Sequence, residues 1–319
     1  MQNSQMGPHA TFLDAVSPSE IAQRLEAASV QRAGLPTRSL ILLAGLGGIY
    51  LGFGGALSTL VATETMLGYG LGRLATGLAF SLGLFMLVVA GGELFTGNNL
   101  MVLAFASRKI SFQAVLRNWV LVYAANAVGA VALALVIHLS GVMDNAAVKA
   151  TVVRIAETKA HLGMTPAFLR GVLCNMLVCL AVWLSVGARS VEGKAIAIAL
   201  PISAFVALGF EHCIANFYLL PIGMLNGAQI GFTDFVGNVV AVTLGNTLGG
   251  VIVAATYYVV FLSDHRPHAY SETKTGSAAA LRREATKPNG LSNSPSTGMR
   301  MVARRLMVGG TPWLRSAEK

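Results

Sequence analysis

Two matching motifs contain the side chains best suited to chemistry in this sequence. Both have the pattern Gly-x-Glu-x-x-x-x-Asn, at residues 91–98 and 209–216, and both lie inside long apolar segments. Carboxylates are rare in such segments, because a charge at the centre of a bilayer costs ~2.5–3.5 kcal/mol on insertion scales. Breaks at corresponding places in two halves of a chain are typical of a transport site between membrane repeats.

His212 is the most informative side chain, because it stands at the second break. An unperturbed imidazole titrates near pH ~6.5, so it can donate to an anion or pass a proton. The first motif offers the hydroxyl of Thr96 at a similar depth, and the two side chains could together recognise one small oxyacid. The alternative is that His212 only satisfies backbone groups that the break sets free.

The other polar residues allow two readings each. We expect Glu93 and Glu211 to accept backbone N–H groups freed at the breaks, since lipid cannot satisfy these groups; proton relay is the alternative. Asn175 and Asn216 lie inside apolar segments, where amides often bond to neighbouring helices. Lys159 precedes the fourth apolar segment, and on the sequence alone it is a solvated loop lysine.

The composition predicts an all-α integral membrane protein. The 319 residues are 54% hydrophobic and only 12% charged, about half the charged fraction of a soluble domain. Several apolar runs reach the ~20 residues that span a bilayer. The expected spans are residues 39–63, 74–107, 112–141, 165–187, 195–225 and 235–263. The second and fifth are too long for one plain crossing, and these two contain the breaks.

The spans form two repeats of three. Asn118, Asn126 and Gly129 in the third span match Asn238, Asn246 and Gly249 in the sixth. An odd number of spans per repeat inverts the second copy, so the repeats are antiparallel. The two breaks then approach the midplane from opposite sides, which is the geometry of an aquaporin-like pore.

Three regions are expected along the chain. Residues 1–38 form a cytoplasmic segment with an amphipathic helix, which starts at Ser17-Pro18-Ser19-Glu20 with a capping box and either packs on the membrane domain or gates a pore. Residues 39–263 form the channel domain. Residues 264–319 form a basic, disordered tail that could lie on anionic lipid, and nucleic-acid binding is not expected so close to a membrane.

The ends of the chain and the cysteines complete these expectations. The Lys and Arg distribution places both termini in the cytoplasm, and the first 38 residues lack the apolar region of a signal peptide. The protein is therefore expected in the inner (plasma) membrane. The three cysteines lie in apolar segments and are expected as free thiols, and no spacing suggests a metal or another cofactor.

At the motif level the chain resembles the formate/nitrite transporter family. The likeness rests on Gly-Glu-Leu-Phe-Thr-Gly-Asn at 92–98, Gly-Phe-Glu-His-Cys-Ile-Ala-Asn at 209–216 and Gly-Asn-Thr-Leu-Gly-Gly at 245–250. It covers about residues 17–263. The resemblance implies a homopentamer with one aquaporin-like pore per subunit, which passes small monovalent anions such as formate, nitrite or hydrosulfide.

By position, the resemblance also implies roles for single residues. His212 would be the central histidine, with Thr96 in the loop opposite it. Lys159 and Asn175 would belong to the outer vestibule and its polar wall, and Asn216 would support the histidine region. The two apolar constrictions would be formed by Phe80, Leu84, Leu94, Phe95 and Phe205. Cys213 departs from the small residue, often serine, that the family has there, and we interpret it as a packing position.

A mechanism follows from these roles. A bare anion cannot cross a dry apolar constriction, because desolvating an isolated charge is too costly. Lys159 would concentrate the anion, and protonation at or near His212 would produce a neutral acid that passes the phenylalanines. The alternatives are an aquaporin-like pore for neutral solutes, whose usual Asn-Pro-Ala pair is absent from the sequence, and a membrane enzyme, for which the sequence offers no ligand cluster or nucleophile–base pair.

Overall fold

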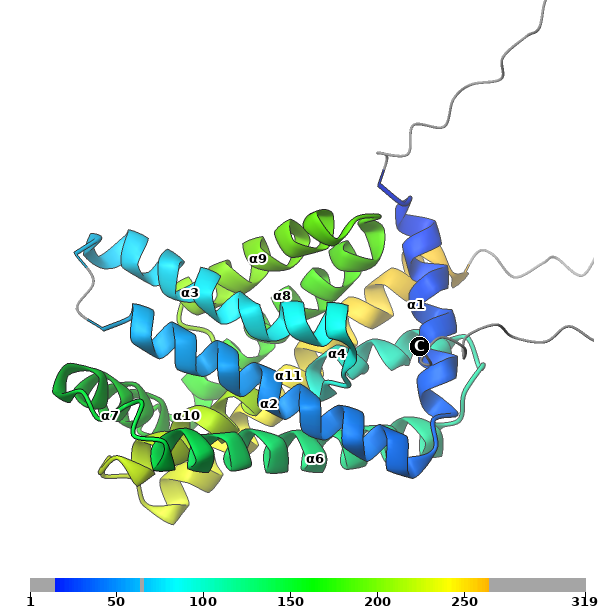
Figure 1. The fold of residues 1–319 in the computed structure, drawn as a ribbon. Helices are drawn as coiled ribbons and strands as arrows, with labels where there is room; N and C mark the ends of the chain where they lie inside the picture. The colour runs from blue at the N-terminus through cyan, green and yellow to red at the C-terminus, as the bar shows by residue number, and fades with distance from the viewer. Residues whose placement is uncertain (1–14, 64–65, 264–319) are drawn as a thin grey trace, which may run out of the picture. The chain divides into compact units, whose positions relative to one another are not determined.

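The computed structural model describes residues 15–63 and 66–263, and these residues form helices joined by short connections (Figure 1). The longer helices are α1 (Pro18–Ala33), α2 (Thr37–Val61), α3 (Gly68–Met86), α6 (Phe112–Leu139), α7 (Ala146–Ala160), α8 (Met164–Gly187), α9 (Val191–Ala207), α10 (Cys213–Leu225) and α11 (Phe232–Phe261). Between α3 and α6 lie a π-helix (Leu87–Gly91), α4 (Phe95–Asn98), a 3₁₀ turn (Asn99–Met101) and α5 (Val102–Ala106). The predicted all-α class is confirmed for this part of the chain.

Within the part of the chain that the structure describes, five helical stretches are long and apolar enough to cross a membrane. They are Thr37–Val61, Gly68–Gly91, Phe112–Leu139, Met164–Gly187 and Phe232–Phe261. The predicted second span was set too late at residue 74, because its helix begins at Gly68. The predicted fifth span is two shorter helices, α9 and α10, and the second continues after its break as the short apolar stretch Phe95–Ala106.

The helices pack in two corresponding sets. Helix α2 packs against α3 and α6, and α8 packs against α9 and α11, while α3 and α9 join the two sets. Glycines bring the backbones close in both: a Cβ at Gly129 would lie 2.1 Å from the carbonyl oxygen of Gly45, and one at Gly249 would lie 2.2 Å from that of Val172. Any larger residue at Gly129 or Gly249 would force these helices apart.

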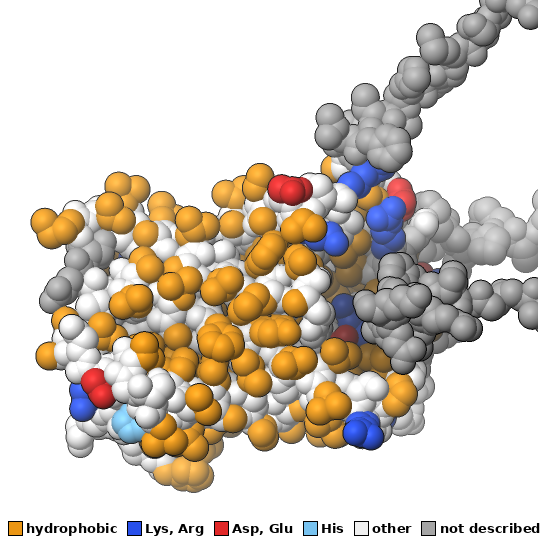
Figure 2. Space-filling model, viewed as in Figure 1, with side chains coloured by type: hydrophobic (Ala, Val, Ile, Leu, Met, Phe, Trp, Pro, Cys, Tyr) orange, Lys and Arg blue, Asp and Glu red, His pale blue; other side chains and the backbone are white. Residues whose placement is uncertain are grey.

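The outer surface of the bundle is apolar. Leu42, Val128 and Leu200 are exposed by 60%, 70% and 70% in the single chain, and hydrophobic side chains spread over the face that includes α2, α3 and α6 (Figure 2). Most charged side chains in this view lie near the two ends of the helices. This pattern fits a lipid-facing band between two aqueous surfaces.

Helix α1 starts where the sequence predicts. Ser17 accepts from the Glu20 N–H, and Pro18 occupies the first turn. The predicted capping box is incomplete, because the Glu20 carboxylate accepts from Arg24 at 2.7 Å instead. Ile21 and Leu25 pack in an apolar cluster with side chains of α5, α8 and α11. Helix α1 lies at one end of the membrane helices and α7 at the other (Figure 1).

Other expectations fall on residues that the structure does not describe. The basic tail at 264–319 lies outside the described residues, as do residues 1–14 of the N-terminal segment. The boundaries 1–38, 39–263 and 264–319 therefore stay predictions.

Candidate functional site

Both predicted breaks are present, each at a glycine with a positive φ. The first half-helix ends in the π-helix at Gly91 (φ +94°), and extended backbone leads to α4. Helix α9 ends at Ala207, Gly209 has φ +73°, and α10 begins at Cys213. Side chains with a Cβ rarely adopt this conformation, which explains the glycine that opens each motif.

Two asparagines satisfy the backbone at the breaks. The Asn126 side chain accepts from the Phe95 N–H at 2.9 Å and donates to the carbonyls of Ala44 and Glu93 at 2.6 and 2.9 Å. Asn246 does the same at the second break: it accepts from Cys213 N–H at 2.9 Å and donates to the Gly171 and Glu211 carbonyls at 2.8 and 2.9 Å. These buried amides join each break to two neighbouring helices.

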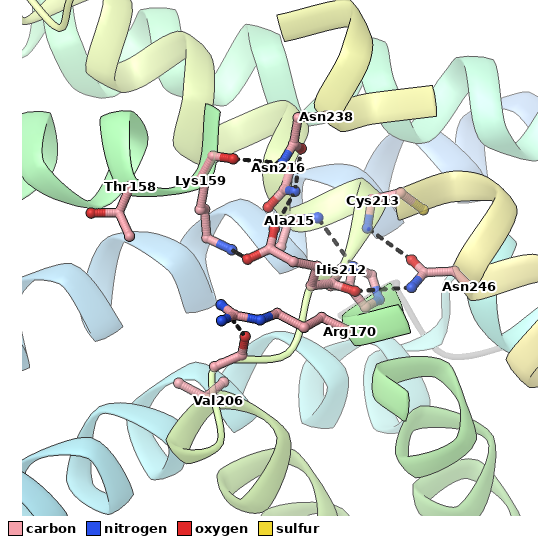
Figure 3. A network of polar contacts seen from close by, with 12 residues as sticks. Thr158, Lys159, Arg170, Val206, His212, Cys213, Ala215, Asn216, Asn238 and Asn246 are labelled. Atoms are coloured by element: carbon pink, nitrogen blue, oxygen red, sulfur yellow. Dashed lines mark hydrogen bonds and ion pairs between the residues drawn. The ribbon is translucent and has the colours of Figure 1, made fainter. Parts of the chain in front are cut away.

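This arrangement corrects the expected role of the two glutamates. Neither Glu93 nor Glu211 accepts a backbone N–H among the described hydrogen bonds. Each carboxylate instead accepts from the asparagine that closes its motif, Glu93 from Asn98 at 2.6 Å and Glu211 from Asn216 at 2.8 Å. Asn98 also donates to Asn118 at 2.9 Å. Asn216 donates to Asn238 at 2.8 Å (Figure 3).

A cation binds each carboxylate. The Lys159 ammonium lies 2.9 Å from Glu211 (Figure 3), and the Arg32 guanidinium lies 3.2 Å from Glu93. Lys159 is near the end of α7 and Arg32 near the end of α1, so the two helices make corresponding contacts at opposite ends of the bundle. Lys159 is thus no free loop lysine, and Arg32 is a counterpart that the sequence analysis missed.

His212 and Thr96 meet between the breaks. His212 Nε2 lies 3.0 Å from Thr96 Oγ1, and both side chains are buried. Nδ1 accepts the Ala215 N–H at 3.1 Å and so caps α10. Since an accepting ring nitrogen carries no hydrogen, the ring proton lies on Nε2 and points at Thr96. The expected facing of hydroxyl and imidazole is present.

Asn175 bonds to the backbone of Thr96. Its side-chain amide lies 3.3 Å from the Thr96 carbonyl and 2.7 Å from the Asn246 carbonyl, and it is fully buried. The sequence analysis placed it with Lys159 in the outer vestibule and its polar wall, but it does not line the cavity that contains Lys159. The amide instead links the Thr96 segment to α11.

Two cavities approach this pair of residues from the two ends. The cavity at the α1 end, which we call the inner cavity, has a volume of about 710 Å³ and includes Arg32, Glu93, Leu84 and Leu94 in its lining. The cavity at the α7 end, which we call the outer cavity, has a volume of about 530 Å³ and a lining that includes Lys159, Glu211, Phe80, Phe205 and His212. Each therefore combines a carboxylate–cation pair with apolar residues expected at a constriction.

The expected apolar residues separate into three groups. Phe80 and Phe205 pack edge to face with centroids 5.6 Å apart, and Phe205 stacks 6.1 Å from the His212 ring. Leu84 and Leu94 belong to the inner cavity. Phe95 lines neither cavity and packs instead against Trp119 and Tyr123.

Some of the missed residues had a sequence signal. Asn126 and Asn246 were recognised as matching positions in the two repeats, and a buried amide at the same place in each repeat could have been assigned to the breaks. Arg32 would have been found only by extending the repeat into the N-terminal helix, where the surrounding residues differ.

Comparison with known proteins agrees with this site. A family model described as Formate/nitrite transporter matches residues 19–260. The chain is 37% identical over 268 residues to a probable formate transporter of Methanothermobacter thermautotrophicus, covering 78% of this chain and 98% of that relative. It is 34% identical over 278 residues to the formate channel FocA of Escherichia coli K12, covering 80% and 98%.

A solved structure is also similar. A pentameric formate channel with formate bound has a TM-score of 0.65 and 36% sequence identity to this chain, and the match covers 71% of this chain and 98% of that one. The family model covers most of this chain, including both breaks and the His212–Thr96 pair. The chain belongs to the formate/nitrite transporter family, whose members are membrane transport proteins.

Proposed function

We propose that this protein conducts small monovalent weak-acid anions across the membrane, with formate or nitrite as the preferred substrate. The observation that carries the proposal is the His212–Thr96 pair, where a buried ring N–H and a buried hydroxyl meet between two cavities that are each lined by cationic side chains. Relatives named as formate transporters and the formate-bound pentamer support formate as the first candidate.

The outer cavity collects the anion. Lys159 raises the local anion concentration, while Glu211 holds the ammonium in place and keeps the cation from trapping the substrate. Arg32 and Glu93 act in the same way in the inner cavity. A cation partly neutralised by a carboxylate attracts an anion without binding it irreversibly, as conduction requires.

The anion must then be neutralised before it can pass the apolar residues. Phe80 and Phe205 at one cavity, and Leu84 and Leu94 at the other, give a dry path that a charge crosses at high cost. The only N–H of the His212 ring is on Nε2, because Nδ1 accepts the Ala215 N–H at the start of α10. His212 therefore donates a hydrogen bond to the substrate, and the neutralising proton comes from water in the cavity.

The architecture in the membrane is part of the proposal. Spans two and five are each made of two half-helices, giving six crossings in two inverted repeats of aquaporin-like form. The corresponding contacts of Asn126 with Asn246, and of Arg32 with Lys159, support this pairing. We place the channel in the inner membrane as a homopentamer, with both termini cytoplasmic and the outer cavity facing away from the cytoplasm.

The channel domain is assigned to residues 39–263, between a cytoplasmic N-terminal segment and the cytoplasmic tail. Nitrite and hydrosulfide remain candidate substrates by size and charge, and no catalytic or cofactor role is proposed. A neutral-solute pore is the less favoured function, because neutral solutes do not need the cations that line both cavities.

Flux into liposomes tests the proposal. Purified protein is reconstituted, and initial uptake of labelled formate and of nitrite is compared with that of glycerol at several pH values. The proposal expects uptake of one or both anions well above empty liposomes, rising as the pH falls because more neutral acid can form. Glycerol uptake without anion uptake would support the neutral-solute pore instead.

A further inference from the structure

Two arginines bind the end of α9, the half-helix that leads into the second break, which we call the outer break because it borders the outer cavity. Arg73, in α3, donates from Nε to the Ala207 carbonyl at 2.5 Å and from Nη2 to the Val206 carbonyl at 2.9 Å. Arg170, in α8, donates from Nη1 to the Gly209 carbonyl at 3.4 Å (Figure 3). Helix α9 ends at Ala207, so the arginines cover its last carbonyls and the turn that follows.

These carbonyls need partners for a physical reason. The last carbonyls of a helix have no partner within it and carry the negative end of its dipole. The chain turns back on itself, so that the N–H groups of Leu208, Gly209 and Phe210 bond to carbonyls of residues 204–206. Arg73 adds a donor at Val206 and supplies one at Ala207.

The covered turn leads directly to the central site. Both arginines line the outer cavity together with Lys159, Glu211 and His212. The Glu211 N–H donates to the Arg170 carbonyl at 3.3 Å, so Arg170 contacts the turn through both its side chain and its backbone. The position of the Glu211–His212 segment therefore depends on what holds the end of α9.

The first break, which borders the inner cavity and is here called the inner break, is built differently. There the Glu93 N–H donates to the Leu43 carbonyl, so Leu43 occupies the place of Arg170. Counting back from the two break glycines, Gly91 and Gly209, Arg73 corresponds to Val191. The side chains of Leu43 and Val191 cannot donate a hydrogen bond. The first half-helix ends in a π-helix instead. The arginine pair thus distinguishes the outer break from the inner one.

We propose that Arg73 and Arg170 are positioning residues of the outer break. They fix the end of α9 and the segment 208–212, which keeps Glu211 and His212 in place, and they cover carbonyl dipoles that would repel an anion in the outer cavity. Arg73 acts through the planar fork of its guanidinium, which reaches two successive carbonyls as a lysine ammonium does not. The part of the proposal that concerns flux rests on the proposed anion transport.

The chain offers a matched control for a role of charge alone. Arg154 also lines the outer cavity, and its side chain makes no hydrogen bond or ion pair within the described part of the chain. Arg154→Gln removes one positive charge from this cavity without touching α9. Arg73→Lys does the reverse, because it keeps the charge and loses the fork.

Two measurements on full-length protein test the proposal. Hydrogen exchange of purified protein in lipid nanodiscs follows the amides of residues 206–212, and liposomes give initial formate uptake at low and high salt. We expect Arg73→Lys and Arg73→Gln to speed exchange of these amides about tenfold and to lower uptake by a similar factor at both salt concentrations. Arg154→Gln should leave exchange unchanged and lower uptake less than about threefold, with a deficit that shrinks as salt screens the field.

Wild-type exchange and uptake in Arg73→Lys would overturn the proposal, because charge alone would then suffice. If the Arg73 variants fail to assemble by size-exclusion chromatography, Arg170→Gln takes their place, since it removes a single bond; unchanged exchange in that variant would also overturn the proposal. If wild-type protein carries no formate, the proposed substrate is wrong, and the exchange measurement still decides the positioning role.

Discussion

His212 is bonded at both ring nitrogens, and the two bonds serve different parts of the molecule. Nδ1 caps α10, and Nε2 faces Thr96 in the central site. Asparagine is among the best N-cap residues, so His212→Asn can keep the cap while its shorter side chain loses contact with Thr96. His212→Phe loses both bonds.

His212→Asn should therefore assemble normally and lose selective, pH-dependent transport. A hydrogen bond to a charged group contributes ~1.5–3 kcal/mol, so formate uptake should fall about tenfold or more. Initial uptake in liposomes across a pH series measures this, with size-exclusion chromatography as the check on assembly. An assembled variant with the wild-type rate and pH profile would remove His212 from its central role.

Lys159 allows a test of how a cation acts in the outer cavity. Lys159→Ala should lower formate uptake more than Lys159→Arg, because arginine keeps the positive charge beside Glu211. If the field alone matters, the wild-type advantage should shrink at high salt, since the Debye length is ~10 Å at 0.1 M and falls further as salt is added. Initial rates at low and high salt give the answer.

The control for this series lies on the same helix. Lys149 is an exposed residue of α7 that does not line the outer cavity, so Lys149→Ala should transport like wild type. Equal rates for wild type and Lys159→Ala at both salt concentrations would return Lys159 to a solvated lysine without a part in transport. Poor rescue by Lys159→Arg at all salt concentrations would instead favour direct contact with desolvated substrate.

At the scale of elements, the interrupted helices depend on amides from helices that are not interrupted. Asn126 on α6 and Asn246 on α11 each make three hydrogen bonds to backbone groups at or beside a break. Each has about the same surroundings, because Gly129 and Gly249, one turn further on, let α2 and α8 approach closely. The breaks are thus fixed by side chains far away in the sequence.

Asn246→Leu should destabilise the protein more than the loss of a buried amide that makes a single side-chain hydrogen bond. It removes the partner that Asn246 gives to the buried Cys213 N–H and to the Glu211 carbonyl in the break, at ~1–3 kcal/mol for each group that water cannot reach. The melting temperature in detergent should fall clearly, whereas Asn226→Ala, which removes only a bond to the Ile222 carbonyl within α10, should have a smaller effect. A melting temperature equal to that of wild type would show that the break holds without Asn246.

At the scale of the whole molecule, the matching contacts at the two breaks extend to α1 and α7. Helix α1 contacts the first break through Arg32, and α7 contacts the second through Lys159, each residue lying near the end of its helix. Helix α1 also contributes Arg24 and Leu25 to the inner cavity. This favours a helix that is part of the transport path over one that merely covers the surface.

Truncation separates the two terminal regions. Removal of the residues after Arg266 should leave formate uptake unchanged, because the tail is outside both repeats and outside the 19–260 match to the family. Removal of residues 1–33 should alter uptake, since it deletes Arg32 and opens the inner cavity. A large loss of uptake in an intact tail-less oligomer would show that the tail takes part in transport.

The sequence by itself determined the class of protein, the two breaks and the central pair. Apolar length, the glycine at each motif and the rarity of carboxylates in membrane segments are local signals, so they need no knowledge of packing. The pairing of His212 with Thr96 was predicted because the two motifs that contain them occupy corresponding places in the two halves of the chain. The resemblance supplied Lys159 and the apolar residues, which composition alone does not distinguish from ordinary span residues.

Only the tertiary structure decided which groups bind which. The glutamates were expected to serve the backbone, but Asn126 and Asn246 reach it from α6 and α11, leaving Glu93 and Glu211 to bind Asn98, Asn216 and the two cations. Arg73 donates to the Ala207 carbonyl although the two residues are 134 positions apart in the sequence. Such partners are set by how helices distant in the chain pack together. Spacing along the sequence carries no information on how close their side chains come in space.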